Sequence, residues 1–286
     1  MDKYKTIEVI EKRKYGTVYR ATNQCTGEIV TLKKIKLTKS EKACGLLTQE
    51  VCILKELKHK NIVKFHEVIY KETIGALVFE SFELNLKDYF KLHGNSIKSE
   101  TTRSFMLQMM KGVSFCHSKN IVHRDLKPRN LFINKSGILK ITDFGLATFQ
   151  DTPHYQFKYN SFSLWYTPPD ILFGATNYLT SYDIWSAGCI FAELSNFGFI
   201  LFPGDNEANQ MEQIFSVLGT PTNHSWPGVQ NLPKFKSYPV YPSNPNWKSL
   251  LPNLSDKGHD LISELIVCNP AKRISADVAL KHPYFF

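Results

Sequence analysis

The sequence predicts an α+β protein with two lobes, a small β-rich lobe followed by a larger α-helical one. Short runs rich in β-branched and aromatic residues dominate up to about residue 80, and apolar residues recur at helical spacing from Lys98 onward. At 286 residues the chain exceeds a typical single domain, which favours two lobes that share a cleft. We expect the hinge near residues 80–83, so that residues 1–81 form the N-lobe and residues 82–286 the C-lobe.

The N-lobe is predicted to be a sheet interrupted by one helix. The helix covers residues 48–57, because Val51, Leu54 and Leu57 recur at helical spacing while Glu50 and Lys55 lie on other faces. The predicted strands are the β-rich runs at residues 7–10, 17–21, 28–35, 62–69 and 76–79.

The C-lobe is predicted to be helical, with loops rich in proline and glycine between the helices. No internal repeat or low-complexity segment is visible, so residues 1–286 are expected to form one domain. The predicted helices cover residues 99–118, 181–194 and 209–218.

Composition and charge favour a globular protein that does not bind nucleic acid. The apolar fraction is 43%, with 13% aromatic residues, well away from the composition of disordered chains. The formal charge is +9, but lysines and arginines are interleaved with acids along most of the chain. We therefore interpret the charge as a solvated basic surface, able to recruit an acidic partner, because nucleic-acid binding proteins cluster their basic residues.

Cysteine usage and hydropathy point to an intracellular protein. The six cysteines are scattered without a CxxC pair, which favours reduced thiols over a disulfide scaffold or a zinc site. The N-terminus has no apolar run typical of a secretory signal, and no segment approaches the ~18 apolar residues of a membrane span. We expect a cytoplasmic or nuclear protein without a membrane partner.

The strongest chemical signal is the stretch that begins His123-Arg124-Asp125 and ends Asp143-Phe144-Gly145. Transfer of a γ-phosphoryl group needs a carboxylate near the attacking hydroxyl, a cation for the phosphates and metal ions across them. Asp125 can accept the substrate proton and Lys127 can offset charge on the γ-phosphate. Asn130 and Asp143 supply the oxygen ligands that Mg²⁺ prefers.

Lys33 and Glu50, which lie earlier in the chain, complete the set of phosphoryl-transfer residues. Lys33 lies in a predicted strand and Glu50 in the next predicted helix, where the two can pair and hold the lysine toward the α- and β-phosphates of ATP. Each motif alone is weak, since a lone strand lysine is usually solvated. Their order along the chain makes a chance match improbable.

Beyond these motifs, the chain resembles cyclin-dependent kinases over essentially its whole length. The resemblance implies a two-lobed protein kinase fold, ATP and Mg²⁺ as cofactors, serine or threonine of protein substrates as acceptors, and a cyclin or cyclin-like activator packed on the helix at residues 44–56. The stretches that carry it are residues 54–63, Trp165-Tyr166, Pro168-Pro169-Asp170, residues 185–194, residues 201–204 and residues 218–222.

The resemblance also assigns site residues. It implies that Ser163 bridges Asp125 and Lys127, that Asp183 anchors the catalytic loop and that Arg273 pairs with Asp170. The positions implied around the adenine and ribose are Ile10, Val18, Thr31, Phe79, Glu80, Phe82, Asn85, Phe132 and Thr142.

The chain departs from the family pattern around the nucleotide. Glu11 and Arg13 replace two glycines of the phosphate-covering loop, whose glycines let backbone N–H groups approach phosphates. Thr31, Phe132 and Thr142 are bulkier or more polar than usual, and Asn85 replaces an acid. Crowding of this kind strains a site by roughly 1–3 kcal/mol unless neighbours adjust.

The activation segment departs as well. Lys158 stands where the family has a phosphorylated hydroxyl, and Gln49 and Thr148 replace two of the three basic residues that would hold the phosphate. Thr167 and Phe162 replace residues on which a preference for proline after the target residue depends.

The sequence as a whole leaves three interpretations. The chain is an active serine/threonine kinase, a pseudokinase that binds a cyclin-like partner, or a nucleic-acid binding protein, and the last of these is poorly supported.

Overall fold

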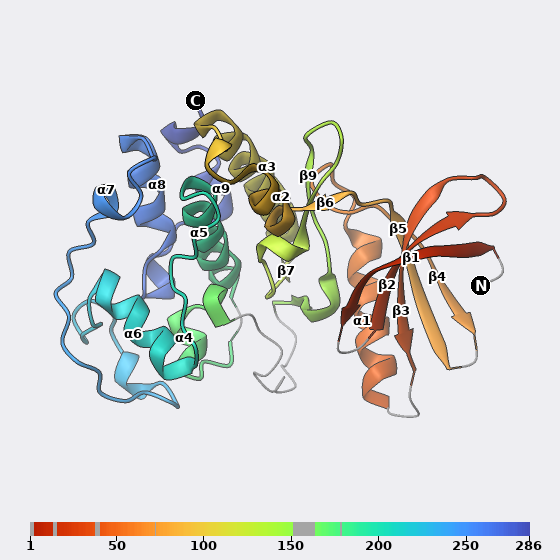
Figure 1. The fold of residues 1–286 in the computed structure, drawn as a ribbon. Helices are drawn as coiled ribbons and strands as arrows, with labels where there is room; N and C mark the ends of the chain where they lie inside the picture. The colour runs from red at the N-terminus through yellow and green to blue at the C-terminus, as the bar shows by residue number, and fades with distance from the viewer. Residues whose placement is uncertain (1–2, 14–15, 38–40, 72, 151–163, 178) are drawn as a thin grey trace.

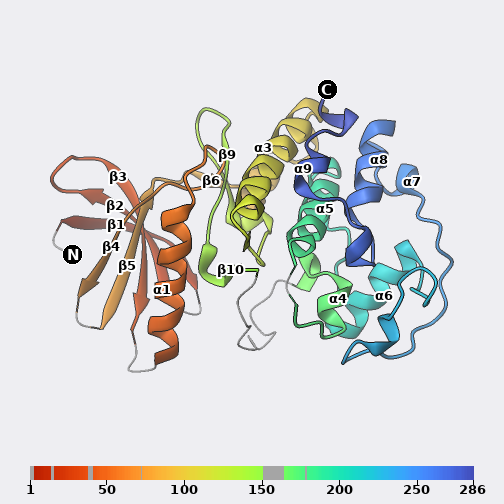
Figure 2. The same cartoon turned by 180° about the vertical axis from the view of Figure 1, so that it is seen from behind.

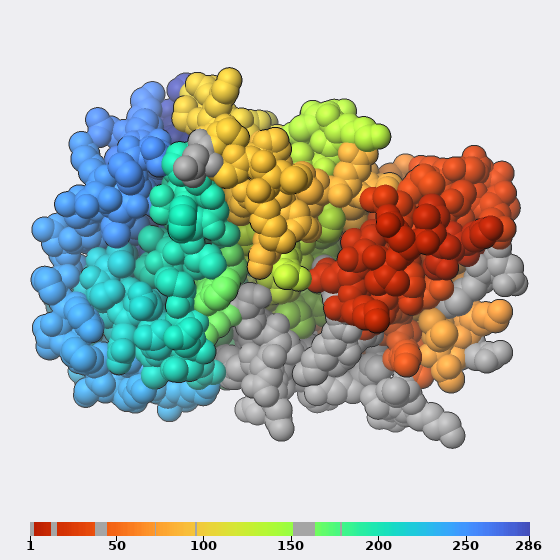
Figure 3. Space-filling model, in the orientation of Figure 1, coloured from red at the N-terminus to blue at the C-terminus, as the bar shows by residue number. Residues whose placement is uncertain are grey.

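The computed structural model describes residues 3–13, 16–37, 41–71, 73–150, 164–177 and 179–286. It confirms the predicted α+β fold of two lobes. Figure 1 shows a sheet with one helix on one side of the molecule and a bundle of helices on the other. The space-filling view shows the two lobes packed against each other along the middle of the molecule (Figure 3).

The N-lobe is a five-stranded antiparallel sheet with the order β1-β2-β3-β5-β4. Helix α1 (Glu41–Glu56) lies along one face of this sheet, on the side toward the C-lobe (Figure 2). The strands are β1 (Tyr4–Arg13), β2 (Gly16–Asn23), β3 (Ile29–Lys36), β4 (Phe65–Lys71) and β5 (Ile74–Glu80).

Strand β4 begins at Phe65, so the predicted start at residue 62 is wrong. Ile62 forms a parallel bridge with Ile141, and the amide of Val63 donates to the Ile141 carbonyl oxygen at 2.9 Å. The backbone at this point is therefore already paired with the C-lobe and cannot join the sheet. Helix α1 begins seven residues before the predicted start at residue 48, since its first residue is Glu41.

The chain passes between the lobes after β5, which ends at Glu80. Strand β6 (Leu84–Asn85) already belongs to a second sheet with β8 (Leu131–Ile133) and β9 (Leu139–Ile141). A two-stranded pair of β7 (Ile121–Val122) and β10 (Thr148–Phe149) flanks the catalytic loop. These short strands place the motif residues at the boundary of the lobes.

The C-lobe is built around α5, whose fifteen residues are almost all buried. This helix is buried on every side, as expected of one at the centre of a lobe. The helices of this lobe are α2 (Leu86–His93), α3 (Ser99–Ser118), α4 (Pro169–Leu172), α5 (Ser181–Ser195), α6 (Glu207–Leu218), α7 (Trp247–Leu250), α8 (Asp256–Leu265) and α9 (Ala276–Ala279). Helix α6 starts two residues before its predicted start, because the Asn206 side chain accepts from the Asn209 amide at 3.0 Å and caps it.

One hydrophobic cluster joins the two lobes. It runs from Leu47 and Val51 of α1 through Phe144 to Ile190 and Leu261 of the C-lobe. The lobes therefore share a core beneath the cleft, which fixes the position of α1 relative to the catalytic loop. Among the residues that the structure describes, no helix is long and apolar enough to cross a membrane.

Candidate active site

The catalytic loop at residues 123–130 is held from below by a buried carboxylate. Asp183, in the first turn of α5, accepts from the amides of His123 at 2.8 Å and Arg124 at 2.9 Å. Burial opposes ionisation of Asp183, but hydrogen bonds from His117 and the loop amides outweigh it and lower the pKa. Arg124 adopts a left-handed backbone with φ of 63°, and these two amide bonds hold that turn in place.

His123 fixes the loop from within. It is buried, and burial lowers the pKa of its imidazole. Its Nδ1 accepts from the amide of Asp125 at 3.2 Å, so its Nε2 carries the proton and donates to the Thr142 carbonyl oxygen at 2.9 Å. Its ring also meets the ring of Phe144 edge to face, at 4.8 Å between centroids. A neutral histidine therefore links the catalytic loop to the Asp143-Phe144-Gly145 turn.

Asp125, Lys127 and Asn130 form one hydrogen-bonded group. The Lys127 ammonium lies 2.9 Å from Asp125 Oδ1. The Asn130 amide nitrogen donates to the Asp125 carbonyl oxygen at 2.8 Å and to its Oδ2 at 2.9 Å. These bonds fix the direction of the carboxylate, which a group that accepts a substrate proton requires.

Lys33 bridges the two lobes on the other side of the cleft. Its ammonium donates to Glu50 Oε1 at 2.7 Å and to Asp143 Oδ1 at 2.8 Å. Glu50 is 3% exposed, so this pairing of β3 with α1 takes place in a largely dry environment. The strand lysine, the helix glutamate and the Asp143 turn therefore meet at one point.

A side chain at position 145 would crowd this ionic group, because the backbone there passes close to it. A Cβ on Gly145 would lie 3.1 Å from the Lys33 ammonium nitrogen and 3.3 Å from Glu50 Oε2. Asp143 itself has a left-handed backbone, with φ of 62°. The turn is thus shaped to bring the Asp143 carboxylate to Lys33.

Two further bonds tie the segment after this turn to the lobes. The Gln49 side-chain amide on α1 donates to the Ala147 carbonyl oxygen at 2.8 Å. The Arg124 Nε donates to the Leu146 carbonyl oxygen at 2.6 Å. The resemblance implies a basic, phosphate-binding residue at the position of Gln49. Gln49 instead bonds α1 directly to the backbone of the segment after the Asp143 turn.

The residues present fit a magnesium ion. Asn130 Oδ1 is buried and, among the described residues, has no hydrogen-bond partner, because its amide nitrogen makes both of the bonds to Asp125. A buried oxygen without a partner is costly unless a cation or water satisfies it. Asp143 adds a carboxylate, and the pair is the hard oxygen set that Mg²⁺ prefers.

The predicted adenine wall is narrow and aromatic. The Phe82 and Phe132 rings lie 4.6 Å apart between centroids, and Phe79 lies behind Phe82 at 6.3 Å. The hydroxyl oxygen of buried Thr31 accepts from the Phe82 backbone amide at 3.3 Å. A hinge donor at this wall is therefore already engaged by a side chain.

The remaining nucleotide candidates differ in what surrounds them. Ile10 on β1 is 37% exposed, and Val18 on β2 pairs in register with Lys33. Asn85 caps α2, since its Oδ1 accepts from the Asp88 amide at 2.9 Å and its amide nitrogen donates to Asp88 Oδ2 at 2.7 Å. Both polar ends of Asn85 are thus used inside its own helix.

The Glu80 side chain turns away from the cleft. Its Oε1 accepts from the Lys64 amide at 2.7 Å and from the Lys140 ammonium at 2.8 Å. Three other positions named from the sequence, Ser163, Lys158 and Phe162, lie outside the described residues.

A contact across the mouth of the cleft was not predicted from the sequence. Glu11 Oε1 on β1 lies 3.3 Å from Arg129 Nη1, in the 3₁₀ turn Pro128–Asn130 of the catalytic loop. Glu11 alone signals a lost glycine. An acid in the phosphate-covering loop together with a base in the catalytic loop is the signal that could have predicted the pair.

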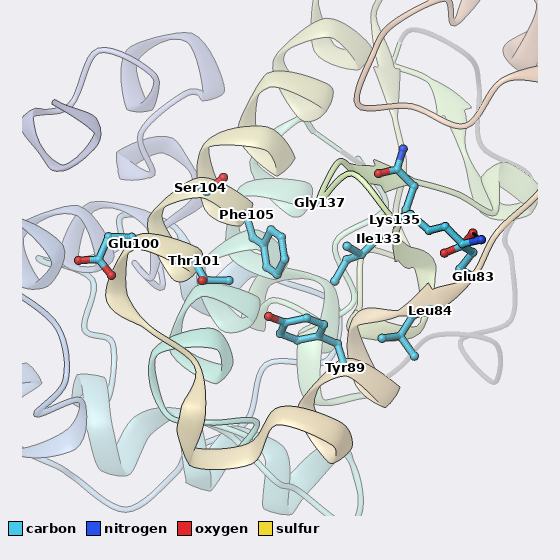
Figure 4. A pocket seen from close by; sticks show the side chains of 11 residues that line it. Glu83, Leu84, Tyr89, Glu100, Thr101, Ser104, Phe105, Ile133, Lys135 and Gly137 are labelled. Atoms are coloured by element: carbon cyan, nitrogen blue, oxygen red, sulfur yellow. Dashed lines mark ion pairs between the residues drawn. The ribbon is translucent and has the colours of Figure 1, made fainter.

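The hollow at the back of the hinge is lined by both apolar and polar side chains and is separate from these groups. It measures about 580 Å³, and neither Lys33 nor Asp125 lines it. Figure 4 shows the rings of Tyr89 and Phe105 pointing into it beside Ile133, with charged groups at its rim. The chemistry therefore belongs to the cleft between the lobes.

The fold and the cleft together define a two-lobed phosphotransferase, in which a β-rich lobe and a helical lobe each contribute ionic groups to one site. The family model described as protein kinase domain matches residues 4–285, nearly the whole sequence. The chain belongs to the protein kinase family. This family uses ATP and Mg²⁺ and acts on proteins.

Proposed function

We propose that this chain is a serine/threonine protein kinase of the cyclin-dependent type, which transfers the γ-phosphate of ATP to hydroxyl groups of proteins. One observation carries the proposal. Lys33, paired with Glu50 and Asp143, faces the same cleft as Asp125 with its partners. The cleft thus holds a cation for the phosphates and an oriented carboxylate for the acceptor.

The roles of the residues follow from these contacts. Asp125 accepts the proton of the attacking hydroxyl, and Lys127 offsets charge on the transferred group and holds Asp125 in place. Magnesium held by Asn130 and Asp143 would offset the charge of the phosphates. Residues 1–286 act as one domain, with lobes at residues 1–81 and 82–286, and Ser163 is assigned to the acceptor side by the resemblance alone.

The cyclin-dependent type rests on the stretches that resemble that family. The partner is proposed to be a cyclin or cyclin-like activator on α1, over residues 44–56. Gly45, Thr48, Cys52 and Lys55 are exposed and recur every three or four residues, so they form one outward face of α1. We propose that the protein acts in the cytoplasm, the nucleus or both.

A second candidate, a binding module with weak or no kinase activity, is favoured by two contacts. Thr31 occupies the Phe82 amide at the adenine wall, and Glu11 pairs across the mouth of the cleft. The Thr31 bond would oppose ATP binding if it persisted in the complex, and Glu11 adds a carboxylate to the loop that covers the phosphates.

Phosphorylation separates the two candidates. Ser-Pro and Ser-non-Pro peptides are incubated with Mg-ATP and candidate activators, beside the Asp143→Asn variant as a matched control. Phosphate incorporation that Asp143→Asn abolishes supports the kinase. Incorporation that persists unchanged in the variant contradicts it, because the proposed metal ligand would then be irrelevant.

Thermal unfolding tests nucleotide binding without catalysis. A ligand that binds only the folded state stabilises it by RT ln(1 + [L]/Kd), about 2.7 kcal/mol at a hundredfold excess over Kd. The absence of a shift at millimolar ATP would favour the binding module.

A further inference from the structure

A second hollow adjoins the catalytic loop on the acceptor side. It measures about 510 Å³ and begins at Lys127, whose ammonium is 2.9 Å from Asp125. A peptide whose hydroxyl reaches Asp125 can therefore place a neighbouring residue over this hollow. It is lined by residues of α2, the catalytic loop, the segment after the activation region and the end of α5, among them Phe90, Leu164, Trp165, Phe197 and Ile200.

The ionic groups of this hollow are mostly cations. Lys87 and Lys91 come from α2, and Lys127 and Arg129 come from the catalytic loop. Glu193 on α5 is the acid among the residues that line it. The excess of positive charge next to Asp125 favours a negatively charged side chain on a bound peptide.

Three of the four cations have acidic partners. Lys91 pairs with Asp88 at 2.7 Å, Arg129 with Glu11 at 3.3 Å and Lys127 with Asp125. Lys87 makes no ion pair within the parts of the chain that the structure describes, and its side chain is half-buried. Its charge acts at longer range on the buried Glu193 and opposes the rise that burial causes in the pKa of that carboxyl, but no salt bridge joins the two side chains.

Glu193 is poorly suited to bind a basic side chain. It is 5% exposed, and the Tyr166 hydroxyl donates to its Oε2 at 2.6 Å. Burial raises the pKa of this carboxyl to about 7, so near neutral pH much of it is protonated. Glu193 is therefore buried and already hydrogen-bonded, and the lysines are the charged groups nearer the surface of the hollow.

We propose that this hollow binds an acidic side chain of the protein substrate, close in sequence to the accepting serine or threonine, and that Lys87 determines this specificity. The inference rests on the proposed kinase function and names its substrate class. A partly exposed charge pair of this kind is expected to favour aspartate over asparagine by about twofold to fivefold in kcat/KM.

The test uses peptides built around one serine, in which aspartate, asparagine or lysine occupies each neighbouring position in turn. The activated kinase should prefer aspartate at one or more positions near the serine, and this preference should shrink with added salt. Lys87→Glu should invert the preference toward lysine at the same positions. Lys257→Glu, the same change of charge on an exposed residue of α8, should leave it unchanged.

Binding of the same peptides, measured by fluorescence anisotropy, separates this inference from the proposed function. Lack of phosphorylation, with an aspartate preference in binding that Lys87→Glu removes, would contradict the kinase and support the acidic-peptide hollow. Phosphorylation with no charge preference, or with a preference for lysine, would overturn the hollow and keep the kinase. Equal binding of all peptides without phosphorylation would overturn both.

Discussion

Glu11 Oε1, on the strand that covers the phosphates, lies 3.3 Å from Arg129 Nη1 of the catalytic loop, so an ion pair joins the N-lobe to the C-lobe across the cleft. The two side chains are 28% and 53% exposed, and pairs at such exposure contribute at most about 1 kcal/mol. The pair therefore biases the position of the loop without locking it. Glu11 occupies a position where family members have a glycine in the phosphate-covering loop.

We predict that this pair holds the loop over bound ATP. Glu11→Gln and Arg129→Gln should each raise KM for ATP by up to about fivefold, the change that ~1 kcal/mol allows. The exchanged pair Glu11→Arg with Arg129→Glu should restore most of the loss. Steady-state kinetics at varied ATP check this, and additive losses in the double variant would show that the two side chains act separately.

The Thr31 hydroxyl is predicted to compete with ATP for the hinge. Thr31→Ala removes the acceptor from the Phe82 amide and also creates space, so KM for ATP should fall by about threefold to tenfold, since a net hydrogen bond contributes ~0.5–1.5 kcal/mol.

Thr31→Val is the matched control, because it keeps the volume and removes the hydroxyl. A gain in both variants would assign the effect to the released amide. A gain in Thr31→Ala alone would assign it to the space, and a loss in both would mean that Thr31 supports the nucleotide.

The sequence was sufficient where local patterns determine the outcome. Lys33 in a strand, Glu50 in the next helix and Asp143 before a glycine are motif positions, and their pairing follows from the family geometry that these motifs imply. The fold class could be predicted for the same reason, because strand-like and helical periodicity separate at the hinge.

The sequence was insufficient where two distant segments compete for the same backbone or side-chain group. Ile62 reads as part of a strand, yet it pairs with Ile141, about eighty positions away. Neither Thr31 nor Phe82 alone shows that a hydroxyl occupies a hinge amide. Such contacts depend on the packed geometry of two lobes, which periodicity does not encode.

The stability of the protein should depend on the protonation of Glu193. Burial raises its pKa from 4.5 to about 7, so the folded state holds a proton that the unfolded state has lost between these values. The stabilising contribution is complete below pH 4.5 and is lost as pH rises to about 7. At 1.36 kcal/mol per unit, the change over this window is about 3 kcal/mol.

Glu193→Gln removes this titration and keeps an acceptor for the Tyr166 hydroxyl. Urea denaturation at several pH values should show the variant gaining stability relative to the wild type between pH 4.5 and 7, and no further above. Parallel curves for the two proteins would contradict the raised pKa.

Two glycines should respond oppositely to alanine. In Gly145→Ala the new Cβ lies 3.1 Å from the Lys33 ammonium nitrogen, so the ionic group must shift and kinase activity should fall by tenfold or more, roughly the effect of displacing a catalytic group. Gly45→Ala, within α1, meets nothing within 4 Å and should stabilise the fold by about 0.5–1 kcal/mol. Activity assays of Gly145→Ala and thermal unfolding of both variants check this, and unchanged activity in Gly145→Ala would contradict the crowding argument.

The buried pair of Arg273 and Asp170 should be the most costly contact to break in the C-lobe. The Arg273 side chain is 0% exposed, its Nη2 lies 2.6 Å from Asp170 Oδ1, and its guanidinium carbon lies 5.1 Å from the centroid of the Trp185 ring. Arg273→Ala leaves the Asp170 carboxylate buried without its cation, which typically costs about 3–5 kcal/mol.

Combining Arg273→Met with Asp170→Asn should cost less than Arg273→Ala alone, because no uncompensated charge then remains. Lys272→Ala, at the exposed neighbouring position, is the control and should change stability by no more than about 0.5 kcal/mol. Chemical denaturation of the four proteins measures these differences. A double variant as unstable as Arg273→Ala would mean that the bonds from Arg273 to backbone carbonyls, rather than the ion pair, hold this part of the lobe together.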